Sequence, residues 1–132
     1  MINSKTLRAA LLLGSLTMIT SCDNMPENTQ VATPMNLNGQ VEYAMKDLAQ
    51  RLDVPLDSVA VSGVRQVTWR SGALGCPEPG MNYTEALVPG SVIYLQADNV
   101  IHAYHAKFAG EPFYCPKERV EPPAHGEEND PT

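Results

Sequence analysis

VIYLQADNVIHAYHAK, residues 92–107, determines the architecture of this chain. Residues 92–97 and Val100–Lys107 are rich in β-branched and aromatic residues, which favour strands. Between the two runs lie Asp98 and Asn99, whose residue types tolerate the positive φ angles of a tight hairpin. The sequence therefore predicts an antiparallel hairpin at the centre of a sheet.

Further strands are expected on both sides of this hairpin. Residues 59–69 alternate in the manner of a strand and predict one long, bent strand with a bulge at Gly63. Residues 113–115 predict a short last strand. Residues 84–88 are interpreted as a further strand or an extended edge, bounded by Pro89-Gly90. The sheet is thus expected to contain about four antiparallel strands.

A helix is expected before the first strand. Apolar residues recur at helical spacing from Val41 to Leu52. Asn38 is the expected N-cap, Glu42 lies in the expected first turn, and Pro55 ends the segment. A helix of about three turns is not stable alone and has to cover a sheet. The predicted fold class is α+β, with one N-terminal helix packed on a small antiparallel sheet and, as argued below, one disulfide.

The N-terminus suggests export. An apolar run at residues 11–19 follows Lys5 and Arg8 and ends in Ile-Thr-Ser-Cys at residues 19–22. This arrangement resembles a bacterial lipoprotein signal peptide, and the run is too short for a membrane-spanning helix. The resemblance implies cleavage before Cys22 and a mature domain held on the extracytoplasmic or periplasmic face of a cell membrane by acyl chains on Cys22. The alternative is an ordinary secretory signal with a nearby thiol.

Asp23 follows the lipidation site and resembles the inner-membrane retention signal of enterobacterial-type lipoproteins. It favours the inner over the outer membrane if the host sorts its lipoproteins in that way. The chain then divides into a signal peptide (1–21), a lipidated tether (22–38), an α+β domain (39–115) and a disordered, acidic, proline-rich tail (116–132).

The three cysteines agree with export. If Cys22 carries lipid, Cys76 and Cys115 remain, and an even pair outside the reducing cytosol usually forms a disulfide. That bond would close a loop of 115 − 76 = 39 residues. The alternative is a free, reactive thiol at Cys76.

Charge and histidine spacing limit the classes of ligand. Removing residues 1–21 leaves 9 − 2 = 7 basic and 15 acidic residues, a net charge of −8, which does not suit nucleic acid or direct binding to anionic lipid. Attachment to the membrane therefore depends on the acyl chains. His102 and His105 are three residues apart on an expected strand, so they point to opposite faces. The sequence predicts no metal site and no cofactor.

WRSGALGCPEPGMNY, residues 69–83, is the most distinctive loop of the chain. Together with the flanking elements it resembles a small, uncharacterised bacterial extracytoplasmic domain over residues 41–115. The resemblance is carried by the LGCPxPGxxY string at residues 74–83 and by Pro89-Gly90, and it departs at Ser91, where an aromatic residue is expected. It implies a fold but no activity.

The loop at residues 69–90 has two interpretations. It either completes the core of a small domain, or it forms a preorganised surface for a protein of the cell envelope. Candidate contact residues for such a partner are Trp69, Leu74, Met81 and Tyr83. We therefore expect a binding or envelope-structural module without catalytic residues. The alternatives are a protease-inhibitor-like protein and, with less support, a small hydrolase that uses His105.

Overall fold

The computed structural model of the protein describes Gly14 and residues 33–125. The predicted signal peptide, the lipidation site Cys22 and the sorting residue Asp23 lie outside the described residues. Within the described part of the chain, no helix has both the length and the apolar character needed to cross a bilayer.

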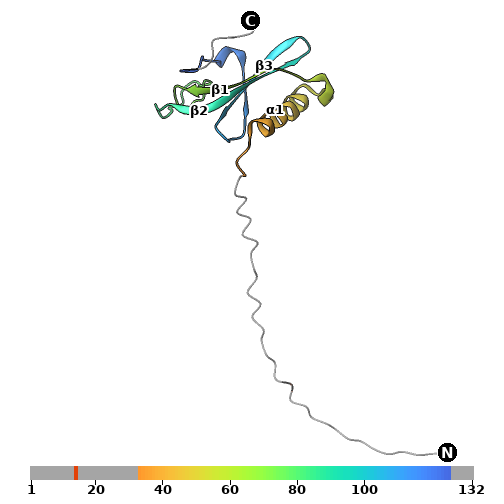
Figure 1. Ribbon diagram of the computed structural model, residues 1–132, viewed down its shortest axis with the longest axis horizontal. Coiled ribbons are helices and arrows are strands. Elements are labelled where there is room, and N and C mark those ends of the chain that lie inside the picture. The colour runs from red at the N-terminus through yellow and green to blue at the C-terminus, as the bar shows by residue number, and fades with distance from the viewer. Residues whose placement is uncertain (1–13, 15–32, 126–132) are drawn as a thin grey trace, which may run out of the picture. The chain divides into compact units, whose positions relative to one another are not determined.

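The domain is a four-stranded antiparallel sheet with one long helix on one face (Figure 1). The strands follow the chain order β1-β2-β3-β4, so every neighbour in the sheet is also a neighbour in sequence. This confirms the predicted α+β class. The elements are α1 (Leu37–Leu52), η1 (Leu56–Ser58), β1 (Ala60–Trp69), β2 (Val88–Ala97), β3 (Val100–Lys107), β4 (Phe113–Cys115) and η2 (Lys117–Arg119).

The central hairpin forms as predicted. Asp98 and Asn99 adopt φ angles of 51° and 62°, the left-handed values that a two-residue hairpin loop requires. Ala97 pairs with Val100 directly beside the turn. The expected bulge in β1 is also present, because the register shifts between Val61 and Gly63.

Strand β2 begins earlier than the sequence suggested. Residues 84–87 are a loop, and β2 runs through Pro89 and Gly90 instead of starting after them. Thr68, which faces Pro89 across the sheet, directs its N–H and C=O outward to residues 124–125. Pro89 has no N–H, but no hydrogen bond to β1 is lost at this position. The Pro89 carbonyl accepts a hydrogen bond of 2.7 Å from the Phe108 N–H.

Helix α1 begins two residues before the expected position. Its N-cap is Asn36 and not Asn38, because the Asn36 side chain accepts a bond of 2.8 Å from the Gly39 N–H. The first turn consequently contains no acidic residue. At the other end, Asp53 takes a left-handed conformation with φ 53°, so the helix ends at Leu52, three residues ahead of Pro55.

Both faces of the sheet are buried. On the face toward α1, Leu48 of the helix forms a core cluster with Ile93, Leu95 and Tyr104 of the sheet. The opposite face carries a second cluster of Val67, Trp69 and Val92. Among the described residues no α-helix covers this second cluster. Leu74 from the loop after β1 packs against it, and the segment after β4 is hydrogen-bonded to that loop and to β1. The loop of residues 69–90 is therefore part of the core architecture as well as of the surface.

The segment after β4 corrects the expected tail. Residues 116–125 follow a defined path: Arg119 donates to the Cys76 and Pro77 carbonyls at 3.0 Å, and the Glu121 N–H donates to the Gly75 carbonyl at 2.8 Å. Composition pointed to disorder, but these residues satisfy backbone groups of the loop that they cover. Residues 126–132 lie outside the described part of the chain.

Candidate functional site

Cys76 and Cys115 form the predicted disulfide, with an S–S distance of 2.07 Å and a Cα–Cα distance of 5.9 Å. Both cysteines are buried. The bond joins the loop after β1 to the last strand, so it holds the loop against the sheet. Cys76 is therefore cross-linked in this structure and is not a free thiol.

Trp69 anchors the inner half of the loop. Its indole N–H donates to the Ala106 carbonyl at 2.9 Å, and its ring stacks on His105 with centroids 4.5 Å apart. A Cβ atom on Gly75 or Gly90 would come within 2.4 or 2.5 Å of the indole, so both glycines make room for it. Trp69 is 1% exposed and is therefore a core residue, not a residue that a partner can touch.

His105 lies beneath Trp69 and is 1% exposed. Its Nδ1 is 2.7 Å from the Leu74 carbonyl, which only accepts, so Nδ1 carries the hydrogen. Its Nε2 is buried and has no partner among the described residues. Burial lowers the pKa of this imidazole and keeps it neutral. A hydrolase would need an accessible base, and here Trp69 and Phe113 flank His105 while Cys76 is held in the disulfide.

His102 lies on the helix side of the sheet, where its ring centroid is 6.0 Å from that of Tyr114. Burial lowers the pKa of His102, opposed by the nearby charge of Asp98. His105 lies on the opposite side, as its odd spacing from His102 predicts. Within residues 33–125, no group of three or more His, Cys, Asp or Glu side chains is arranged to hold a metal ion.

The outer half of the loop, residues 77–87, is exposed; we call it the outer loop. Pro79 and Gly80 occupy a turn closed by a bond of 3.2 Å from the Met81 N–H to the Glu78 carbonyl, with Gly80 at φ 80°. The Tyr83 hydroxyl accepts a bond of 3.0 Å from the Glu78 N–H. Two apolar side chains remain in solvent, Met81 at 58% and Leu87 at 61% exposure.

The four predicted contact residues therefore differ in how exposed they are. Met81 stands on the surface of the outer loop, and Tyr83 is half-buried because its hydroxyl braces the turn. Leu74 is also half-buried and packs beside the Trp69 cluster. Leu87 was missed because residues 84–88 were interpreted as a strand or an extended edge, whereas residues 84–87 form a loop.

A hollow of about 810 Å³ at the hairpin end of the sheet was also missed; we call it the hairpin-end hollow. Tyr94, Ile101 and Val120 form an apolar part of its wall. Lys117 and Glu118 of η2 form a charged part. Ile101 and Val120 are 45% and 39% exposed. The hollow joins β3 to residues 117–120, so it depends on the path of a segment that the sequence did not place.

Gln40 is a buried polar residue that joins α1 to the sheet. Its side-chain N–H groups donate to the Lys107 and Gly110 carbonyls at 3.1 and 2.6 Å, and its carbonyl oxygen accepts from the Ser91 hydroxyl at 2.7 Å. Gln40 lies one helical turn before buried Ala44, so the periodicity of the helix extended one turn further would have found it.

A family described as "Domain of unknown function (DUF8738)" matches residues 41–115, from the first turns of α1 to the second cysteine of the disulfide. No curated protein and no solved structure matches the chain.

Proposed function

The chain belongs to the DUF8738 family, a domain of unknown function, and from that premise we propose that it is a lipid-anchored, extracytoplasmic binding module. In this proposal acyl chains on Cys22 hold the protein at the cell membrane, and the outer loop contacts a protein of the cell envelope. The signal-like N-terminus supports the anchor, and the buried disulfide agrees with an oxidising compartment.

The exposed outer loop is the observation that carries the binding proposal. Its base is fixed by the disulfide and by a bond of 2.9 Å from the Gly72 N–H to the Thr84 carbonyl. Its tip is fixed by the Glu78–Met81 turn and by Arg119, whose guanidinium lies 3.4 Å from the Glu78 carboxylate. A loop held at both ends loses little conformational entropy when a partner binds. Met81 and Leu87 supply the apolar contact area.

Photo-crosslinking in intact cells tests the outer loop. A benzophenone amino acid at Met81 or Leu87 is expected to give discrete crosslinked bands with an envelope protein, because both side chains project into solvent. The matched control is Leu56, an apolar residue on η1 that is 45% exposed and lies outside the loop. We expect no discrete band from position 56.

Two outcomes would contradict this assignment. Bands of equal intensity from positions 56 and 81 would show collision without a specific surface. Bands from Ile101 in the absence of bands from Met81 would move the partner to the hairpin-end hollow. In both cases the outer loop would not be the surface that a partner binds.

Replacing Cys22 by alanine tests the anchor separately. We expect the variant to leave the membrane fraction, because the loss of acyl chains removes about 0.8 kcal/mol of membrane affinity for each buried methylene. The measurement is cell fractionation followed by immunoblotting, with intact mass determination of the wild-type mature N-terminus. A Cys22→Ala protein that remains fully membrane-bound would show that lipidation is not the anchor.

A further inference from the structure

The chain enters the folded domain at one end of the sheet. The Met35 N–H donates to the Ala109 carbonyl at 3.0 Å, so residues leading to α1 are fixed to the turn between β3 and β4. In Figure 1 the start of α1 lies beside this turn, and the hairpin tip lies at the other end of the strands. Between Cys22 and Met35 there are 35 − 22 = 13 residue steps, which span at most about 45 Å. An anchor at Cys22 therefore holds this end within about 45 Å of the bilayer.

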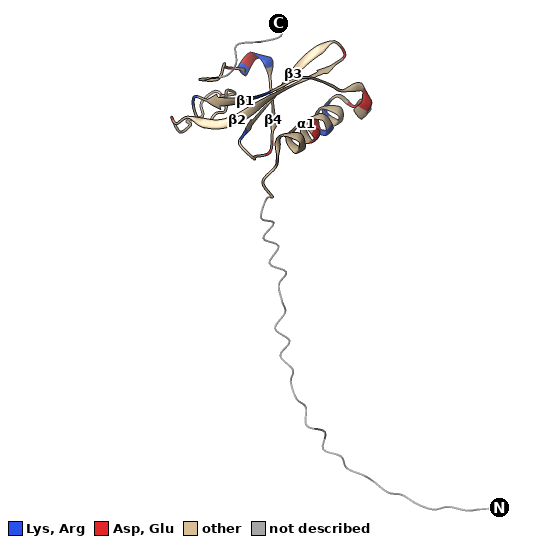
Figure 2. Ribbon diagram, in the orientation of Figure 1, with Lys and Arg blue, Asp and Glu red and all other residues tan. Residues whose placement is uncertain are grey.

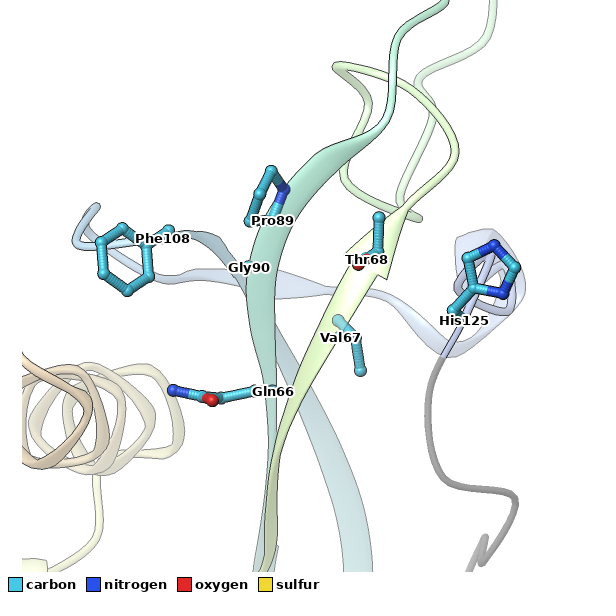
Figure 3. Close-up of a pocket in the computed structure, with 7 residues that line it drawn as sticks. All are labelled: Gln66, Val67, Thr68, Pro89, Gly90, Phe108 and His125. Atoms are coloured by element: carbon cyan, nitrogen blue, oxygen red, sulfur yellow. The ribbon is translucent and has the colours of Figure 1, made fainter.

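Phe108 is the main apolar feature of this end and is 72% exposed. Two adjoining hollows of about 380 and 270 Å³ share Gln66, Gly90 and Phe108 as lining residues. Figure 3 shows the Phe108 ring on one side of the strand pair and His125 on the other, with Pro89 between them. We call this region the anchor-side surface; it consists of Met35, Leu37, Gln66, Pro89 and Phe108 with the polar side chains between them.

The residues that line the two hollows include no acidic side chain, although exposed Glu111 lies in the same turn as Phe108. Neither hollow is lined by Asp, Glu, Lys or Arg. The first turn of α1 has no acidic residue, so the positive end of the helix dipole is not neutralised there, and exposed Lys107 adds a positive charge beside Phe108. Figure 2 shows further charged residues on the later turns of α1, on η1 and on η2. The lining of the two hollows therefore adds no charge repulsion of its own toward an anionic bilayer.

We propose that the anchor-side surface contacts the lipid headgroup region of the membrane that holds the protein, with the Phe108 ring inserted among the headgroups. The inference rests on the proposed anchor at Cys22. The anchor-side surface has amide and hydroxyl groups around one aromatic ring, and this mixture suits the interface between water and hydrocarbon. The contact needs little affinity of its own, because a short tether gives a high effective concentration at the membrane.

Contact between the anchor-side surface and the lipid headgroups fixes the orientation of the domain relative to the bilayer. The strands then point away from the bilayer, and the hairpin tip stands about 26 Å further out, since eight residue steps along β3 lead from Val100 to Phe108, the residue after the strand. The outer loop and the hairpin-end hollow would both remain accessible to proteins of the envelope.

Fluorescence quenching by brominated lipids tests the contact. The mature chain is coupled through the Cys22 thiol to a maleimide lipid, which is selective because Cys76 and Cys115 are already cross-linked. It is placed in vesicles of phosphatidylethanolamine and phosphatidylglycerol with brominated acyl chains. We expect the new indole of Phe108→Trp to lose much of its emission, because a ring among the headgroups lies close to the brominated chains. The control Val100→Trp, 53% exposed at the far end of β3, should keep its emission. Buried Trp69 gives the same background in both variants.

Equal quenching at positions 108 and 100, or no quenching at either, would overturn the proposal. The first result describes a domain without a fixed orientation, and the second describes one that stands clear of the headgroups. Because the lipid is attached chemically, both results are independent of whether the cell acylates Cys22. Failure of the anchor is measured by the Cys22→Ala fractionation, so the two failures are distinguishable.

Discussion

Replacing both Cys76 and Cys115 by alanine is expected to lower the free energy of unfolding by about 4 kcal/mol. The disulfide closes a loop of 39 residues, and opening it lets the unfolded chain regain the corresponding conformational entropy. Domains of this size have a total stability of about 5 to 15 kcal/mol, so the loss removes a large part of it. The loop and residues 116–125, which depend on each other for backbone bonds, should be the first to open.

Urea denaturation of the oxidised wild type and of the double alanine variant, followed by circular dichroism, measures this difference. The control is the wild type in a reducing agent, which removes the bond without changing the side-chain volume. We expect the reduced wild type to resemble the variant. A loss below about 1 kcal/mol in both samples would show that the bond constrains little and that the loop is held by its packing.

The features that the sequence predicted best are those with local causes. Asp98 and Asn99 form a tight turn because their own side chains tolerate positive φ, and the flanking runs are strand formers whatever surrounds them. The bulge near Gly63 and the disulfide are similar cases, since one residue type or one pairing rule is sufficient to indicate them.

The features that the sequence missed have non-local causes. Asn36 and Asn38 are equally good caps by residue type; Asn36 is selected because the preceding residue, Met35, is hydrogen-bonded to Ala109, a residue far away in the sequence. Pro89 was read as a strand boundary, yet its partner Thr68 does not bond to it. Each outcome depends on a contact between segments far apart in the sequence.

The candidate site was predicted in outline and not in detail. A rigid loop around Cys76 was expected, but its division into a buried inner half and an exposed outer loop follows from the packing of Trp69 between Gly75, Gly90 and His105. Hydrophobicity alone does not separate Trp69 from Met81. The hairpin-end hollow requires the path of residues 116–125, which their proline-rich composition concealed.

Trp69→Ala is expected to lower the free energy of unfolding by about 3 to 5 kcal/mol, the range for an aromatic residue removed from a core. Three losses contribute. The cavity lies where two glycines leave no side chains that could move in, the Ala106 carbonyl loses its donor, and His105 loses the ring that covers it. Water could then reach the Nε2 atom of His105, which in the wild type has no partner among the described residues.

Two further variants isolate the cause. Trp69→Phe keeps a ring over His105 but removes the N–H, so we expect a smaller loss than for alanine. Phe108→Ala removes an aromatic ring that is 72% exposed and should change stability in solution by less than about 0.5 kcal/mol. Chemical denaturation of the three variants gives the order. If Trp69→Ala cost no more than Phe108→Ala, the inner half of the loop would not be part of the core, and the separation between a buried inner half and a free outer loop would fail with it.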